Sequence, residues 1–122
     1  MRKLVYVTHP FGGNFDRLRD MRGVMRNLAD VGLQYILFWA PWVDVCTCLV
    51  DTPENRSRGL KFDRHAIMVS HGLMEIVHGK PSSGQMTERK WAEALGLPIV
   101  TANGYDDLER AALDIANELG VT

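Results

Sequence analysis

Two hydrophobic patterns alternate along this chain. Short, nearly continuous apolar runs are typical of strands buried on both faces, and they occur at residues 4–8, 34–39, 73–77 and 98–101. Apolar residues that recur every three or four positions predict helices at residues 15–31, 54–70, 85–95 and 105–119. For the second of these helices, we expect an inner side made of Leu60, Ala66, Ile67 and Val69. Residues 40–53 follow neither pattern, so we expect a loop there.

The regular alternation of strand and helix predicts one parallel sheet with helices on both faces. A chain of 122 residues fits a single domain, and we expect residues 1–122 to form a three-layer α/β/α sandwich. This fold class is Rossmann-like (flavodoxin-like), with about four strands in the order 2-1-3-4. In such sheets ligands bind beyond the carboxyl ends of the strands, which here selects the loops at residues 9–14, 40–53 and 78–84.

The first of these loops follows a strand, opens a helix and contains Pro10, Phe11, Gly12 and Gly13. Its two glycines would let backbone N–H groups approach a ligand, and the N-terminus of a helix favours an anion. The loop lacks both the spacing of a dinucleotide-binding loop and the lysine of a P-loop. A plain turn that needs glycine explains this loop equally well.

The third loop, P-S-S-G at residues 81–84, carries a sharper signal. Ser82 and Ser83 offer hydroxyls and N–H groups at the start of a helix, which suits a phosphate. Glu88 lies one turn further on, where a carboxylate could act as a nucleophile or base beside a sugar. Ordinary helix capping, with Ser83 as the N-cap, is the alternative explanation of these residues.

Other candidate residues carry a weaker signal. Asp63 lies on a predicted helix, where a carboxylate is most often solvated. Trp39 and Trp42 follow a strand and could stack on a base, although such residues more often fill a core. Cys46 and Cys48 have no second cysteine pair to complete a zinc site, and the four histidines are scattered singly, so we expect no metal.

Composition narrows the class of protein. The net charge is −1 and the hydrophobic content 46%, which is ordinary for a globular domain and points neither to a nucleic-acid polymer nor to a membrane surface. No apolar run approaches the ~20 residues that span a bilayer. The apolar start ends at His9-Pro10, too early for a signal peptide. We therefore expect a cytoplasmic protein.

Three stretches carry a resemblance to a known family: residues 6–13, the P-S-x-G-x-x-x-E motif at residues 81–88, and A-L-G-L-P-I at residues 94–99. Together they resemble the nucleoside 2-deoxyribosyltransferase superfamily. The Pro-Ser before the glycine is similar to the branch of 2′-deoxynucleoside 5′-monophosphate N-hydrolases. The chain also looks similar to small phage and bacterial domains of unknown function. The resemblance implies a homodimeric, cofactor-free enzyme that cleaves the N-glycosidic bond of a nucleotide or nucleoside by hydrolysis or transfer.

The resemblance also assigns roles to single residues. Glu88 matches the catalytic glutamate, which attacks C1′ of the sugar and forms a glycosyl-enzyme intermediate. Asp63 matches the second carboxylate, which protonates or orients the departing base. Ser82 matches the serine that contacts the 5′-phosphate, and Gly84 matches the glycine of its loop. Further contacts with substrate or phosphate are expected from Ser83, Pro10, Phe11, Gly12, Gly13, Arg17 and Trp39.

Two other functions would use the same residues. In a nucleotide-binding or sensing domain without turnover, Glu88 would only accept hydrogen bonds from a ribose. In a structural domain, Glu88 would only contribute to capping. An Asp63 side chain that points away from Glu88 would favour binding over catalysis.

Overall fold

The structure is a computed structural model that describes residues 2–10, 15–31, 34–43, 50 and 52–121. The strands are β1 (Lys3–Thr8), β2 (Ile36–Trp39), β3 (Gly72–Val77) and β4 (Ile99–Asn103). The longer helices are α1 (Phe15–Asp30), α3 (Pro53–Val69), α4 (Ser83–Ala94) and α5 (Leu108–Glu118), and the 3-10 helix η1 (Tyr105–Asp107) precedes α5. The predicted alternation of strands and helices is confirmed, with small differences at the ends of the elements.

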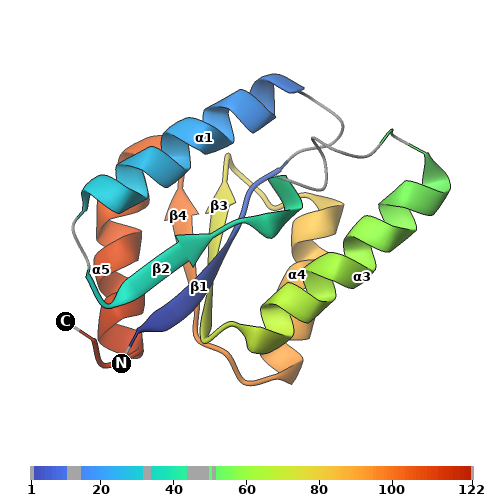
Figure 1. Ribbon diagram of the computed structural model, residues 1–122. Coiled ribbons are helices and arrows are strands. Elements are labelled where there is room, and N and C mark those ends of the chain that lie inside the picture. Colours follow the sequence, from blue (N-terminus) through green and yellow to red (C-terminus); the bar gives the residue numbers. More distant parts are fainter. Residues whose placement is uncertain (1, 11–14, 32–33, 44–49, 51, 122) are drawn as a thin grey trace.

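Within the described residues, four parallel strands form one sheet in the predicted order β2-β1-β3-β4 (Figure 1). β1 pairs with β2 as far as Tyr6 opposite Trp39, and with β3 as far as Thr8 opposite Glu75. The chain first steps from β1 to β2 and then returns past β1 to β3 and β4, so the direction reverses between β1 and β3. In sheets of this kind, ligands bind beyond the carboxyl ends of the strands on either side of such a switch point, here β1 and β3.

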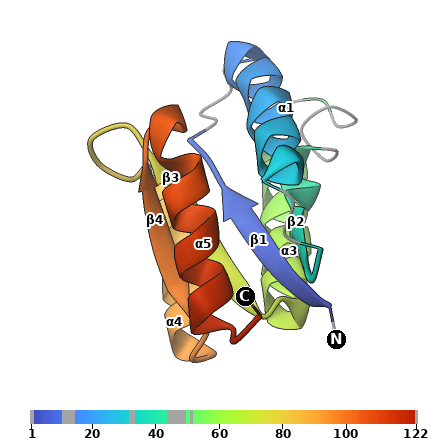
Figure 2. The same cartoon turned by 90° about the vertical axis from the view of Figure 1, so that its left-hand side faces the viewer.

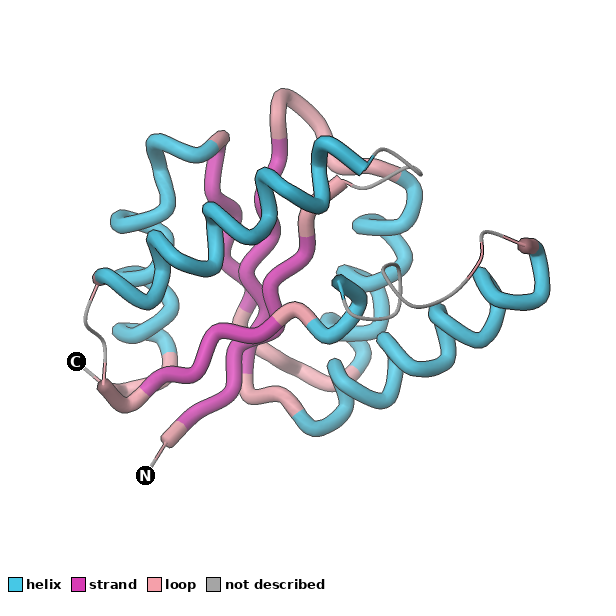
Figure 3. Tube along the Cα trace, turned by 45° about the horizontal axis from the view of Figure 1, so that its top comes forward, coloured by secondary structure: helices cyan, strands magenta, loops and turns pink. Residues whose placement is uncertain are grey.

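Helices cover both faces of the sheet. α1 and α5 pack together on one face, and α3 and α4 pack together on the other (Figures 1 and 2). Right-handed crossovers that run in opposite directions across a sheet place their helices on opposite faces, which explains this division. The tube view shows the strands as a central layer between the helices (Figure 3). The three-layer α/β/α fold is therefore confirmed.

The two central strands form much of the core. Val5, Tyr6 and Val7 in β1 are fully buried, and all six residues of β3 are buried. Parallel strands with helices on both faces have no solvent side, so their sequences read as continuous apolar runs. The exceptions to this rule, the polar groups buried on β1 and β3, therefore need a separate explanation.

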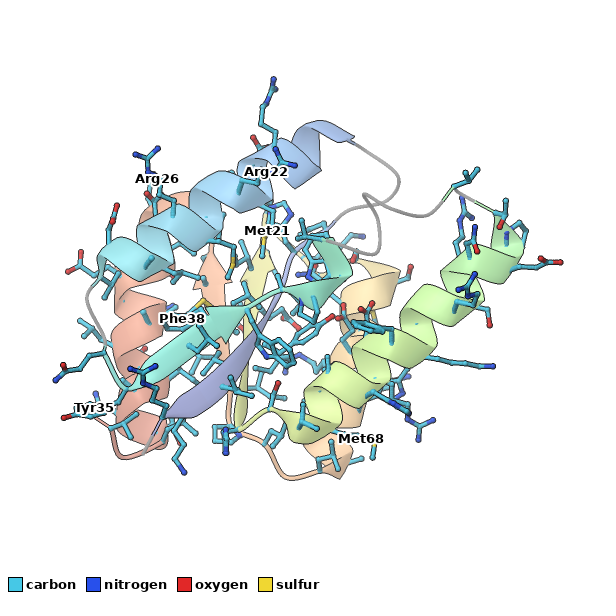
Figure 4. The ribbon with its side chains drawn as sticks, viewed as in Figure 1. Met21, Arg22, Arg26, Tyr35, Phe38 and Met68 are labelled. Atoms are coloured by element: carbon cyan, nitrogen blue, oxygen red, sulfur yellow. The ribbon has the colours of Figure 1, made fainter. Side chains whose placement is uncertain are left out.

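α1 is amphipathic in the predicted way. Its buried residues Met21, Val24 and Leu28 lie on one side of the helix. Figure 4 shows Met21 directed toward the sheet, whereas Arg22 and Arg26 extend outward from the same helix. None of the described helices is long and apolar enough to cross a lipid bilayer.

The segment after β2 differs from the predicted loop. Residues 41–43 are helical, and the Trp42 indole is buried and donates a hydrogen bond of 2.9 Å to the carbonyl oxygen of Val7. A buried indole N–H needs such a partner, so Trp42 fills the core beside β1. Cys46 and Cys48 lie outside the described residues.

The predicted inner side of α3 is partly wrong. Ala66 and Ile67 are buried, but Leu60 is 45% exposed and Val69 is 59% exposed. At 100° per residue, positions 60 and 69 lie on opposite sides of a helix, so they could not both face the sheet. Small residues, Gly59 and Ala66, instead allow α3 to lie close against the rest of the molecule.

Candidate functional site

Gln85 ties the start of α4 to the sheet. Ser82 is the N-cap: its Oγ accepts from the N–H of Gln85 at 3.2 Å, and the Gln85 side chain accepts from the N–H of Ser82 at 3.0 Å. The Gln85 amide also donates to the carbonyl oxygens of Ile76 at 2.6 Å and Thr8 at 3.4 Å. Because Gln85 is buried, these bonds fix the first turn of α4 against the carboxyl ends of β1 and β3.

Glu88 follows Gln85 by three residues, so its side chain leaves α4 on the same side and reaches β1. It is only 9% exposed, and the fully buried hydroxyl of Thr8 donates a hydrogen bond of 3.0 Å to its Oε1. A carboxylate that only capped a helix would stay in water. Glu88 is instead directed into the protein.

Tyr6 and Asp63 complete a buried cluster around Glu88. Tyr6 and Thr8 are two positions apart on β1, so they point to the same face of the sheet, which α3 and α4 cover. The Tyr6 hydroxyl lies close enough to both carboxyls to affect the pKa of each. However, Tyr6 Oη, Asp63 Oδ1 and Glu88 Oε2 are all buried without a hydrogen bond of normal length and angle. Polar atoms from β1, α3 and α4 thus face one another without satisfying one another.

Burial and a nearby negative charge raise the pKa of both carboxyls. The pKa of Asp63 is raised to about 7, first by burial and then by the charge of Glu88. Burial also raises the pKa of Glu88, whereas the nearby Tyr6 hydroxyl and the hydrogen bond from Thr8 act in the opposite direction, and the charge of Glu75 raises it again. Burial and the two nearby carboxylates raise the pKa of the Tyr6 phenol, which therefore stays protonated. Near neutral pH, Asp63 exists in both protonated and ionised forms.

This arrangement divides two chemical roles between two carboxyls. Thr8 and Tyr6 direct hydroxyl groups at Glu88 and favour its ionised form. The surroundings of Asp63 stabilise its ionised form less than water would, so Asp63 keeps its proton up to a higher pH than an exposed aspartate does. A pair of carboxyls with different environments can supply one nucleophile and one acid, which is the arrangement that glycosidic-bond cleavage requires.

A partly buried ion pair holds the next residue of α4. Arg89 donates from Nε to Glu75 at 3.0 Å and from its terminal nitrogen to the other oxygen of Glu75 at 3.1 Å. The same nitrogen donates to Thr101 Oγ1 at 3.2 Å. Glu75 is 1% exposed, and its two-point pairing with Arg89 fixes this turn of α4 relative to β3 and β4. Glu88 is thereby held in position from the adjacent residue.

The predicted P-S-S-G residues lie one turn before Glu88. Ser82 caps α4, and Ser83 and Gly84 form its first turn, so the predicted N-cap at Ser83 is wrong by one position. Pro10 is buried just beyond the end of β1. These residues and Glu88 therefore gather at the carboxyl end of the sheet, which is where the sequence placed the ligand loops.

Some predicted contacts lie outside the described part of the structure. Phe11, Gly12 and Gly13 belong to a segment whose placement is not described. Arg17 lies on α1, but its side chain is also outside the description. The roles of these four residues stay predictions.

Trp39 does not join the cluster. Its indole Nε1 donates a hydrogen bond of 3.0 Å to Ser70 Oγ, just before β3 begins, and its ring packs against the core. This bond ties Ser70, which precedes β3, to the last residue of β2. This is the core-filling role that was the alternative to base stacking.

Two residues of the cluster, Tyr6 and Thr8, were not predicted. The signal for them was present, because hydroxyl side chains two positions apart on a strand share one face. Both stand near the carboxyl end of the first strand, where ligands were expected. Nothing in the local sequence distinguishes them from ordinary buried residues, so only their contacts identify them.

The hollow between α1 and α5 is separate from the Glu88 cluster, and no metal site is found among the described residues. In the part of the chain that the structure describes, no three His, Cys, Asp or Glu side chains are arranged to hold a metal ion. A hollow lined by residues that include Asn27, Asp30 and Glu109 lies between α1 and α5, on the other face of the sheet from Glu88.

Comparison with known proteins shows that the chain shares its fold with an enzyme of known structure. No family model matches the chain, and no curated protein matches it in sequence. Among solved structures, the chain is similar to a 2-deoxyribosyltransferase from Leishmania mexicana, with a TM-score of 0.57 and 17% identity. The chain shares the fold of that enzyme. The similarity covers 83% of this chain but 64% of the enzyme, so the chain spans less than two thirds of the enzyme's length.

Proposed function

We propose that this chain cleaves the N-glycosidic bond of a (deoxy)nucleoside 5′-monophosphate, with Glu88 as nucleophile and Asp63 as acid. The observation that supports this proposal best is the buried Glu88 carboxylate, which accepts a hydrogen bond from Thr8 and faces Tyr6 and Asp63. Buried polar atoms without partners lower the stability of a protein. Such a cost is typical of sites that are arranged for chemistry.

The first chemical step moves the sugar onto the protein. An ionised oxygen of Glu88 attacks C1′, the bond between C1′ and the base nitrogen breaks, and its electron pair stays with the base. Asp63 gives its proton to the base, which leaves as a neutral molecule. Positive charge develops on the sugar ring in the transition state, and the nearby carboxylate of Glu88 stabilises it.

The second step releases the sugar. Asp63, now ionised, takes a proton from water, and the water oxygen attacks C1′. The ester bond to Glu88 breaks, which frees the sugar phosphate and restores both carboxyls. If a second base replaces water in this step, the same chemistry becomes transfer. Carboxyl groups alone carry both steps, so no metal ion or organic cofactor is needed.

The start of α4 supports a phosphorylated substrate. The N–H groups at the N-terminus of a helix favour a phosphate, and Ser82, Ser83 and Gly84 lie there. A Cβ added at Gly84 would meet only the Oγ of Ser82, at 4.0 Å. Packing within the chain therefore does not require glycine at position 84, whereas close approach of a ligand would.

Release of free base from deoxynucleoside 5′-monophosphates, followed by chromatography, tests the proposal. We expect release by the natural chain and none by Glu88→Gln. Asp63→Asn should lower the rate by about 100-fold or more, because it cannot donate a proton. Glu118→Gln, which changes an exposed carboxylate on α5, is the control and should keep the rate.

Two outcomes of this experiment would overturn the proposal. Base release that persists in Glu88→Gln would show that the nucleophile is a different group. Nucleotide binding without any base release by the natural chain would show a binding or sensing domain, in which Glu88 only accepts hydrogen bonds from the sugar.

We also propose that the chain acts in the cytoplasm as a homodimer. α3 carries exposed apolar side chains, and two of them, Phe62 and Val69, are seven positions apart and so lie on the same side of the helix, where a second copy could cover them. Surfaces of this kind are common where proteins associate. Light scattering should give the mass of a dimer, and the mass of a monomer would contradict this part of the proposal.

A further inference from the structure

A second cluster of side chains lies at the carboxyl edge of the sheet, next to the Glu88 cluster. His9 follows β1, His78 follows β3, and Tyr105 follows β4. The Nε2 atoms of the two imidazoles are 3.4 Å apart, and Tyr105 Oη lies 2.7 Å from His9 Nε2. All three rings contact one another. His9 and His78 therefore stand at the switch point between β1 and β3, where sheets of this kind bind ligands.

The partners of His9 determine where its hydrogens lie. His9 Nδ1 is 2.9 Å from the carbonyl oxygen of Pro10, which can only accept, so Nδ1 carries a hydrogen. In the neutral ring, Nε2 is then an acceptor for the hydroxyl hydrogen of Tyr105. When His9 gains a second proton, Nε2 becomes a donor, and Tyr105 can turn its hydrogen toward Asp20, 3.5 Å away. The cluster thus accommodates His9 as a neutral group and as a cation.

His78 brings a second imidazole to the same point. His78 is exposed, whereas His9 is 5% exposed, so the pair reaches from the interior to the surface. The chain turns sharply after His78, at Gly79, whose φ of 95° is strained for other residues. Two imidazolium nitrogens 3.4 Å apart would repel each other. An anion that accepts a hydrogen bond from His78 beside His9 would reduce this repulsion.

We propose that His9, His78 and Tyr105 bind a phosphate-class anion, and that this anion is the phosphate group of the nucleotide. The identity of the ligand rests on the function proposed above. His9 directly follows Thr8, which holds Glu88, but neighbouring side chains of a strand point to opposite faces, so a nucleotide would have to lie across the edge of the sheet to reach both the imidazoles and Glu88. His78 directly precedes the loop that leads into α4. The two histidines therefore border both loops that were expected to contact the substrate.

The charged groups around the cluster give the site a pH dependence. Asp20 of α1 faces Tyr105, and Lys80 pairs through its backbone with His78. The carboxylate of Asp20 disfavours an anion at the outer side of Tyr105, so the space beside the two imidazoles is the better position. Histidine side chains change charge between about pH 5 and 8, so binding of a phosphate dianion should take up protons and weaken as the pH rises over that range.

The experiment uses inorganic phosphate as the probe and follows the imidazole signals of the full chain by NMR at pH 7. Phosphate should move the signals of His9 and His78 toward the protonated form and leave those of His65, an exposed residue of α3, unchanged. His78→Gln should weaken phosphate binding about tenfold or more at pH 6 and reduce its pH dependence, because a charged donor is lost. His65→Gln is the matched control and should bind as the natural chain does.

A second set of titrations identifies the source of the phosphate. A deoxynucleoside 5′-monophosphate should move the same two signals, and the nucleoside without phosphate should not. The proposal would be overturned if the signals of His9 and His78 did not move when inorganic phosphate was added, or did not move when the monophosphate was added. So would unchanged phosphate binding by His78→Gln.

The anion site and the proposed chemistry can fail separately. Glu88→Gln should still bind phosphate, because Glu88 takes no part in the imidazole pair. If the natural chain releases no base but phosphate moves both imidazole signals, the proposed function fails and the anion site stands. If base is released but phosphate does not move the imidazole signals, the anion site is wrong and the proposed function stands.

Discussion

Thr8 and Glu88 are 80 positions apart in the chain, and the hydroxyl of Thr8 donates a hydrogen bond of 3.0 Å to the carboxylate of Glu88. Both side chains are buried, so little water competes for this bond. A hydroxyl that donates to a carboxylate stabilises its ionised form and lowers its pKa. Thr8 therefore opposes the burial that would otherwise keep Glu88 protonated.

Thr8→Val should raise the pKa of Glu88, because it keeps the shape of the side chain and removes the donor. A smaller fraction of Glu88 is then ionised at low pH, so the acid side of the pH-rate profile for base release should move to higher pH. Thr8→Ser keeps the hydroxyl and should keep the profile close to that of the natural chain. An unchanged profile for Thr8→Val would show that the bond does not control the ionisation of Glu88.

Asp63 should make the fold less stable as the pH rises. Its pKa is about 7 in the folded chain against an ordinary 3.8, so between these values the folded state keeps a proton that the unfolded state has lost. The free energy of unfolding therefore falls over this range, by roughly 4 kcal/mol at most.

Urea unfolding at pH 4.5, 6 and 8 checks this prediction. Asp63→Asn carries no titrating group and should gain stability relative to the natural chain as the pH increases. Asp30→Asn changes an exposed carboxyl and should leave the pH dependence as it is. Equal pH dependence in the natural chain and in Asp63→Asn would contradict the raised pKa.

Tyr6→Phe should separate stability from activity. The Tyr6 hydroxyl is buried without a normal hydrogen bond, so its removal should leave the free energy of unfolding unchanged or raise it by about 1 kcal/mol. The same change removes a donor that favours the ionised form of Glu88, so base release should slow by about tenfold. Tyr35→Phe, at an exposed position, should alter neither quantity. A loss of stability with full activity would show that Tyr6 is only part of the core.

Gly84→Ala tests whether a ligand lies against the first turn of α4. A Cβ has room there in the free protein, and alanine favours a helix over glycine by up to about 1 kcal/mol. Thermal stability should therefore hold or rise, whereas the KM for the nucleotide should increase because the Cβ hinders close approach of the ligand to this turn. Gly23→Ala, in an open position on α1, should gain stability without a change in KM. Equal KM values for Gly84→Ala and Gly23→Ala would show that no ligand lies against this turn.

The sheet could be predicted from the sequence because β1 and β3 are buried on both faces, which leaves continuous apolar runs. Glu88 could be named because the motif at residues 81–88 marks it, and Asp63 could be named only through the family resemblance; the structure brings the two together. The buried side of α3 could not be predicted, since its apolar residues surround the helix. Which of them faces inward depends on the contacts of α3 with the sheet and with α4.

Tyr6, Thr8 and His9 are the part of the site that sequence reasoning missed. On a strand, neighbouring side chains point to opposite faces, so their roles depend on which helix covers each face. Thr8 acquires a role only through Glu88, and His9 only through His78 and Tyr105. These partners of Thr8 and His9 are 69 or more positions away in the chain, a separation at which a single sequence gives no pairing information.

The amide of Gln85 reaches backbone oxygens at the ends of β1 and β3 while it also closes the cap of α4. α4 cannot lift from the strands unless this buried amide gives up its partners, so the helix and the central sheet open as one cooperative unit. Glu88, one turn further along α4, belongs to the same unit, so the amide hydrogens around it should exchange with solvent only when the sheet itself opens.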